Sequence, residues 1–375
     1  MSRLNTLSRL GRGDRSRSAA ASGEGSGLPS RRRGLTAVGL SSILALAAVA
    51  LVGGSAATAA PSCDGKAATI VGHGDGVDIE GTPGSDVIVG TAGPDLIEGR
   101  GGEDTICGSG GDDSIEGSAE ADVLSGGSGN DLLVARGGGD RLYGGAGDDD
   151  AFADEGDDRT SGGPGSDRLV GGEGDDRVFG ESDSDELEGG LGDDHVVGSA
   201  GNDVLEGEGF DSPGGGNDRL SGGEGRDRLA GDGGDDSLAG GSGDDVFRGG
   251  DGRDIVDYRP RTAPVRVTIG DGANDGESSP RERDDVRTGV ERIHGGHGDD
   301  YLTGDAAANS LYGAGGGDTL TGRAGQDSLH GNDGADAIDS ADGTPDAVFC
   351  GAGQDSVASD VVELELLRSS CESRS

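Results

Sequence analysis

Apolar side chains recur at a fixed interval of nine residues along most of this chain. An apolar residue every nine positions can line neither a helix face nor a conventional half-buried strand. The interval therefore predicts one very short strand per nine residues, stacked in successive coils, each contributing one inward side chain. The first run of apolar positions, in which Ala151 and Thr160 are weak members, is Ile88, Ile97, Ile106, Ile115, Leu124, Leu133, Leu142, Leu169, Val178, Leu187, Val196 and Leu205.

Polar residues follow the same interval. Fourteen aspartates stand nine residues apart from Asp86 to Asp203, without a miss, and glycines cluster at the first, second and fourth positions of each unit. Glycine permits a positive φ and lets backbone carbonyls crowd a shared centre, to which the aspartate at the sixth position adds a carboxylate. Carbonyl and carboxylate oxygens are hard ligands that suit Ca²⁺ rather than zinc or copper.

The interruptions of the repeat divide the chain. We predict an N-terminal cap over 60–80, repeat arrays over 81–206, 213–257 and 295–339, an insertion at 207–212, an insert at 258–294, and degenerate repeats with a C-terminal cap over 340–375. Within the insert, 265–269 alternates like a strand, and we expect a surface excursion. Asp271, Asp275 and Glu282 match three positions of an EF-hand loop, which we interpret as mostly coincidence because Ala273 holds the third position and no flanking helix is evident.

These units resemble the G-G-x-G-x-D-x-U-x nonapeptide of the repeats-in-toxin (RTX), hemolysin-type calcium-binding proteins. Residues 171–179 (GGEGDDRVF) and 240–248 (GGSGDDVFR) match it in full. The resemblance implies an all-β, right-handed parallel β-roll with two repeats per coil, and calcium held between stacked loops by the sixth-position aspartate. The residues it assigns as ligands are Asp86, Asp95, Asp104, Asp113, Asp131, Asp149, Asp167, Asp176, Asp194, Asp203, Asp218, Asp227, Asp236, Asp245, Asp254, Asp300, Asp318, Asp327 and Asp336.

Some units depart from the motif. Residues 117–120 and 180–183 lack the fourth-position glycine, and Asn309 replaces the aspartate, so we expect weak or empty sites there. The alternative to a calcium-bound roll is a solvated acidic low-complexity chain, but acidic disorder does not hold phase over fourteen units.

Composition sharpens the calcium prediction. A formal charge of −43 repels nucleic acid and anionic lipid, and makes cations the natural partners. Only 30% of residues are apolar, too few for a conventional core. One buried aliphatic side chain per nine residues does not offset the entropy of ordering them. We therefore predict a chain that is disordered without Ca²⁺ and folds on binding several ions.

The N-terminal segment carries a predicted export signal, and cysteines lie near both ends of the chain that would remain after its cleavage. Residues 1–59 read as a basic segment, an uncharged stretch and a small-residue cleavage site, which predicts a secretory signal (Sec or possibly Tat) rather than the alternative of an uncleaved membrane anchor. Four cysteines in a secreted chain suggest two disulfides, and sequence proximity favours Cys63–Cys107 and Cys350–Cys371 among three pairings. We expect them to cap the ends of the roll.

Catalytic motifs are missing from the sequence. There is no H-E-x-x-H or G-x-S-x-G, and the lone lysine, Lys66, lies outside any P-loop. We therefore expect a secreted, non-enzymatic calcium-binding protein with a structural, surface or adhesive role and no membrane association after signal cleavage. The alternative is a calcium-dependent extracellular hydrolase or toxin-like effector with its active surface on the roll.

Overall fold

The computed structural model describes residues 61–74, 76–208, 215–272, 274–277, 282–359, 371 and 373–374. Regular structure in these residues is β-strand throughout, with no helix. No described helix is therefore long and apolar enough to span a membrane. The predicted signal segment and most of the predicted 207–212 insertion lie outside the described residues.

The strands form three sheets and one short antiparallel pair. The pair is β1 (Ser62–Cys63) with β2 (Lys66–Ala67). The 15-stranded sheet contains β3 (Ile70–Val71), β5 (Val87–Val89), β7 (Thr105–Cys107), β9 (Val123–Ser128), β11 (Arg141–Ala146), β13 (Arg159–Pro164), β15 (Arg177–Ser182), β17 (His195–Ala200), β19 (Arg219–Glu224), β21 (Ser237–Ser242), β23 (Ile255–Asp257), β27 (Arg292–His294), β29 (Ser310–Tyr312), β31 (Ser328–Asp333) and β33 (Ala347–Ala352). The 11-stranded sheet contains β4 (Asp78–Glu80), β6 (Leu96–Glu98), β8 (Ser114–Glu116), β10 (Leu132–Val134), β12 (Asp150–Glu155), β14 (Arg168–Glu173), β16 (Glu186–Leu191), β18 (Val204–Glu206), β20 (Arg228–Gly233), β22 (Val246–Asp251) and β26 (Asp285–Val286). The 7-stranded sheet contains β24 (Val265–Thr268), β25 (Gly276–Glu277), β28 (Tyr301–Thr303), β30 (Thr319–Thr321), β32 (Ala337–Ser340), β34 (Ser356–Ser359) and β35 (Ser373–Arg374).

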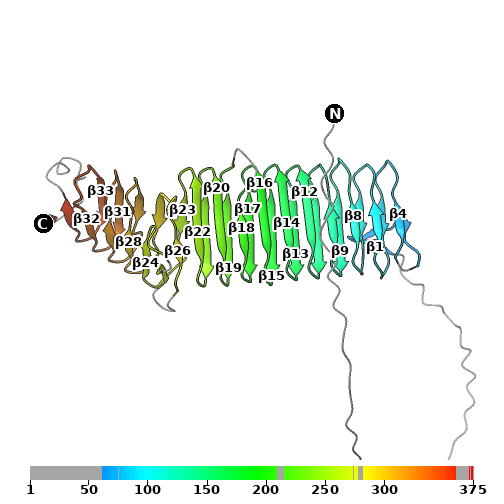
Figure 1. Cartoon of the computed structure of the whole chain (residues 1–375), viewed down its shortest axis with the longest axis horizontal. Helices are drawn as coiled ribbons and strands as arrows, with labels where there is room; N and C mark the ends of the chain where they lie inside the picture. The colour runs from blue at the N-terminus through cyan, green and yellow to red at the C-terminus, as the bar shows by residue number, and fades with distance from the viewer. Residues whose placement is uncertain are drawn as a thin grey trace, which may run out of the picture. The chain divides into compact units, whose positions relative to one another are not determined.

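Successive strands alternate between sheets, so the chain winds as a parallel β-solenoid (Figure 1). Leu124 pairs with Leu142 and Ala151 with Leu169, eighteen residues apart in each case. Two nonapeptides therefore complete one turn, as the RTX resemblance implied.

The core is a row of inward-pointing side chains between the sheets, one from each short strand. Ile88, Leu124 and Leu205 are fully buried, and so are the weak members Ala151 and Thr160. The residues before and after the inward side chain are half-buried or exposed in most strands, as in the pattern of β14; Thr105 and Ser161 are buried exceptions. The prediction of one inward residue per short strand is confirmed.

The insertions lengthen a turn without shifting the register. Across 207–214 the pairing distance rises to 24 residues, with Val196 still opposite Leu220. Across the insert it rises to 39, with Phe247 opposite Val286. The expectation of a surface excursion is wrong for 265–269, because Val265, Val267 and Ile269 are buried and β24 pairs with β28. The alternating apolar residues of this strand complete the core at a place where no nonapeptide supplies an inward side chain.

Both disulfides link the pairs that sequence proximity favours. Cys63 in β1 is bonded to Cys107 in β7, and Cys350 in β33 to Cys371. Each bond ties a terminal segment to a coil of the roll.

Candidate metal centres

The sixth-position aspartates form a ladder between coils. The backbone N–H of Asp113 donates to Oδ1 of Asp131 at 2.8 Å, and the N–H of Asp131 donates to Oδ1 of Asp149 at the same distance. In the regular coils, the carboxylate thus accepts a hydrogen bond from the aspartate eighteen residues earlier, and across the 207–214 insertion from the one 24 residues earlier. This contact holds the side chain in one orientation at the start of its strand.

The second carboxylate oxygen has no hydrogen-bond partner in most repeats. This Oδ2 atom is buried. We call the aspartates that carry such an atom the open aspartates, and each of them is almost completely buried as a residue. A buried charged oxygen without a hydrogen-bond partner is costly, so each of these atoms fits the role of a cation ligand. The open aspartates are Asp104, Asp113, Asp131, Asp140, Asp149, Asp158, Asp167, Asp176, Asp185, Asp194, Asp203, Asp218, Asp227, Asp236, Asp245, Asp254, Asp318, Asp327 and Asp336.

A few repeats satisfy both oxygens within the chain, and we call these closed. The second residue of the repeat donates its backbone N–H to Oδ2 of Asp86, Asp95, Asp122 and Asp300 at 2.6–2.7 Å. Asn309 accepts the equivalent bond from Asp305 through Oδ1 at 2.8 Å. These side chains leave no buried carboxylate oxygen without a partner.

The backbone of the second residue separates the two groups. In every open repeat for which the structure describes this residue, it has a positive φ, such as 115° at Gly127 and 83° at Arg136. In the closed repeats it does not; the residue is Thr82 or Thr91, for example. Thr is branched at Cβ and resists the left-handed region, and its hydroxyl adds a further bond to the aspartate.

The ligands assigned from the sequence and the open aspartates of the structure overlap but are not the same set. Asp86, Asp95 and Asp300 were assigned as ligands but lie in closed repeats. The open aspartates Asp140, Asp158 and Asp185 were not assigned. Their repeats carry Arg136, Asp154 and Glu181 where the motif has its second glycine, yet these residues adopt the glycine-like φ. The nine-residue phase alone would have found them.

The surroundings of the open aspartates disfavour the charged form of the carboxyl group. Burial, together with the charges of the neighbouring carboxylates Asp158 and Asp122, raises the pKa of Asp140 to about 7. Burial, with the charge of Glu208, raises the pKa of Asp218 to about 8. A bound cation would reverse both effects, because it neutralises the carboxylates and replaces their lost hydration.

Close stacking of the loops brings backbone carbonyls near open carboxylate oxygens. A Cβ added at Gly171 would collide with both Oδ2 of Asp176 and the carbonyl oxygen of Gly189 in the next coil. Only glycine fits there, and a carboxylate oxygen and a carbonyl oxygen of successive loops therefore border the same space. Carboxylate and carbonyl oxygens form the donor set that Ca²⁺ prefers, so the residues present fit calcium.

The insert differs from the regular loops, because side chains of the protein contact its carboxylates. Asp284 takes the place of the sixth-position aspartate, accepting the N–H of Asp245 on Oδ1, but its Oδ2 accepts the hydroxyl of Tyr258 at 3.0 Å. Arg261 pairs with Glu282 at 2.8 Å and Glu277 at 3.1 Å, and its guanidinium also contacts the Gly241 carbonyl. The guanidinium supplies a positive charge where the regular loops offer carboxylates.

The EF-hand-like residues serve the same packing. Both carboxylate oxygens of Asp275 accept backbone N–H groups, from Thr268 and Val286. Glu282 is the partner of Arg261. The interpretation of this match as mostly coincidence agrees with these contacts.

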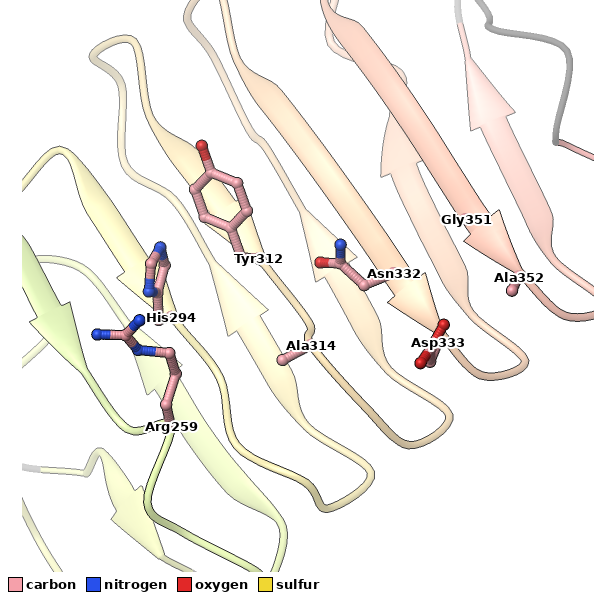
Figure 2. A pocket seen from close by; sticks show the side chains of 8 residues that line it. All are labelled: Arg259, His294, Tyr312, Ala314, Asn332, Asp333, Gly351 and Ala352. Carbon is pink, nitrogen blue, oxygen red and sulfur yellow. The ribbon is translucent and has the colours of Figure 1, made fainter.

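A shallow pocket of about 470 Å³ opens beside β27, β29 and β31 (Figure 2). Figure 2 shows Arg259 and His294 at one end and Gly351 and Ala352 at the other, with Tyr312, Asn332 and Asp333 between them. The Tyr312 ring stacks on His330 at 4.4 Å, and His330 stacks on Phe349 at 4.4 Å. These rings cover one another's faces, so they join adjacent coils rather than present a free aromatic platform.

Comparison with known proteins agrees with this geometry. The family model described as the RTX calcium-binding nonapeptide repeat matches residues 80–115, 108–142, 116–151, 125–160, 152–187, 161–196, 188–209, 213–247, 231–258, 287–320 and 312–344. A search of curated proteins found no match. Since the matched segments cover more than half of the chain and contain all the open aspartates, the chain belongs to the RTX calcium-binding nonapeptide repeat family.

Proposed function

We propose that this protein is a secreted calcium-binding structural protein in which Ca²⁺, held between stacked loops by the open aspartates, folds and stabilises the β-roll. The observation that carries the proposal is the unbroken series of buried Oδ2 atoms without a hydrogen-bond partner from Asp131 to Asp254. We include Asp140, Asp158 and Asp185 among the ligands, and place Asp86, Asp95 and Asp300 outside them.

Calcium acts here as a folding ligand. In the metal-free roll, aspartates of neighbouring coils face one another across the ladder, and burial weakens their solvation. The unfolded chain hydrates and separates the same carboxylates. Ions that bind only the folded loops therefore shift the equilibrium toward the roll, and their binding energy serves as folding energy.

The disulfides support an extracellular location. Both cysteine pairs are disulfide-bonded in the roll, and disulfides require an oxidising compartment to form and persist. With the signal-like segment at 1–59, they favour export, followed by calcium binding outside the cell, where the ion is abundant. We propose a structural, surface or adhesive role, because the sequence and described residues supply ligands for calcium but no catalytic constellation.

Equilibrium dialysis with elemental analysis tests the proposal. The purified protein, dialysed against 1 mM Ca²⁺ or 1 mM Mg²⁺ (about the concentration at which extracellular modules fill), should retain several calcium ions per chain and almost no magnesium. Mg²⁺ demands tighter octahedral geometry and keeps its water, so it is the matched control. Retention of no calcium above a heat-denatured sample would refute calcium binding.

A further inference from the structure

The turn between β32 and β33, both labelled in Figure 1, contains a repeat that is one residue longer than the regular nonapeptide. Its repeat runs Ser340, Ala341, Asp342, Gly343, Thr344, Pro345, Asp346, so one extra residue precedes the sixth-position aspartate. The coil accordingly has nineteen residues, with Ser328 opposite Ala347. Asp346 still takes its place in the ladder, accepting the N–H of Asp327 on Oδ1 at 2.9 Å.

The longer turn brings a third carboxylate to this position. One carboxylate oxygen from each of Asp327, Asp342 and Asp346 lies within 4.8 Å of the others. Asp327 is 2% exposed, and its Oδ2 has no hydrogen-bond partner. A buried oxygen of that kind beside two further carboxylates points to a cation, because the three negative charges otherwise repel one another.

Asp342 is fixed in the turn by its neighbour. The backbone N–H of Thr344 donates to Oδ1 of Asp342 at 2.7 Å, and the Thr344 hydroxyl lies 2.5 Å from the same oxygen. Asp251 and Asp333 also hold third positions of their repeats, but neither joins a group of three metal-ligating side chains among the described residues. The extra residue thus distinguishes Asp342 from acids at equivalent positions.

We propose that Asp327, Asp342 and Asp346 form a calcium site with three carboxylate ligands, which binds more tightly than the regular sites and fills first. The proposal rests on the proposed function, since it assumes that the open aspartates bind calcium. Calcium affinity rises with the number of charged ligands and with the rigidity of the site, and this turn adds one charged, hydrogen-bonded ligand.

The test is a calcium titration of the full protein with Asp342→Asn, using a competing chelator to set free calcium and native mass spectrometry to count bound ions. The variant keeps the size of the side chain and can still accept from Thr344. We expect the affinity for the first ion to fall by about tenfold. Asp333→Asn is the matched control, because it removes an exposed third-position charge outside the cluster and should leave the first ion unchanged.

Asp131→Asn separates the two proposals. If Asp342→Asn binds its first ion like the unmodified protein while Asp131→Asn lowers the total number of ions, the three-carboxylate site is refuted and the proposed function stands. If the unmodified protein binds no calcium, both are refuted. If Asp333→Asn weakens the first ion as much as Asp342→Asn, the effect is general electrostatics and the specific site is refuted.

Discussion

At the residue scale, an aspartate's role depends on a backbone angle four residues before it. A left-handed second residue, such as Gly127, leaves Oδ2 of Asp131 without a partner, whereas Ser118 donates its N–H to Oδ2 of Asp122. The same residue type at the same phase is therefore a candidate metal ligand in one repeat and a turn-closing acceptor in another.

Asp131→Asn and Asp122→Asn should consequently behave differently. Asp131→Asn removes a negative ligand, so we expect fewer bound calcium ions and a smaller rise of the melting temperature as calcium is added. Asp122→Asn leaves an amide N–H facing a backbone N–H and should cost about 1–3 kcal/mol without changing the number of bound ions. Thermal melts over a series of calcium concentrations, with ion counts, distinguish the two variants; identical behaviour would contradict the division into open and closed repeats.

At the element scale, the insert contributes a buried strand, β24, and a positively charged side chain, that of Arg261. The Arg261 side chain is 16% exposed and holds Glu282, whose side chain is 5% exposed. Because a buried carboxylate without its partner is strongly unfavourable, Arg261→Gln should lower the free energy of unfolding by about 3 kcal/mol. The measurement is denaturant unfolding at saturating calcium.

Arg283 provides the matched control. It pairs with Asp244 at 3.2 Å, but its side chain is 62% exposed, so the pair contributes little. Arg283→Gln should change the free energy of unfolding by less than about 1 kcal/mol. A loss as large as that of Arg261→Gln would mean that the insert does not depend on the buried guanidinium.

The two disulfides should differ in their contribution. Cys63 and Cys107 are 44 residues apart, and Cys350 and Cys371 are 21 apart. From loop-closure entropy alone, replacing the first pair by serines should cost about 4 kcal/mol and the second about 3 kcal/mol. Calcium-saturated unfolding of the two double variants measures this; no loss from either would show that the bonds do not constrain the unfolded chain.

At the scale of the whole molecule, the sequence predicted the solenoid because a single periodicity decides it. The nine-residue phase located the inward residues, the two-repeat turn followed from the family, and proximity selected both disulfides. Open and closed repeats could not be separated, because Arg136 and Ser109 adopt a φ that sequence reasoning reserves for glycine. The strand of the insert was predicted, but its burial was missed because its partner, β28, comes from a later array.

The metal-free roll should become more stable on acidification. Burial raises the pKa of Asp149 and Asp176 to about 7 in the folded chain, from an ordinary value of 3.8. The folded chain thus holds more protons than the unfolded chain between about pH 4 and pH 7, and stability falls as pH rises through this window. Far-UV circular dichroism of the metal-depleted protein should therefore show more β structure at about pH 5 than at about pH 7.5. Less β structure at the lower pH would mean that the carboxylates are not buried.

The most direct measurement is a far-UV circular dichroism titration with Ca²⁺, beginning in chelator at neutral pH, with Mg²⁺ in parallel. The account predicts a disordered spectrum that converts cooperatively to β structure with calcium and stays unchanged with magnesium. A full β spectrum in excess chelator would contradict it, because the buried aspartates would then be tolerated without a cation.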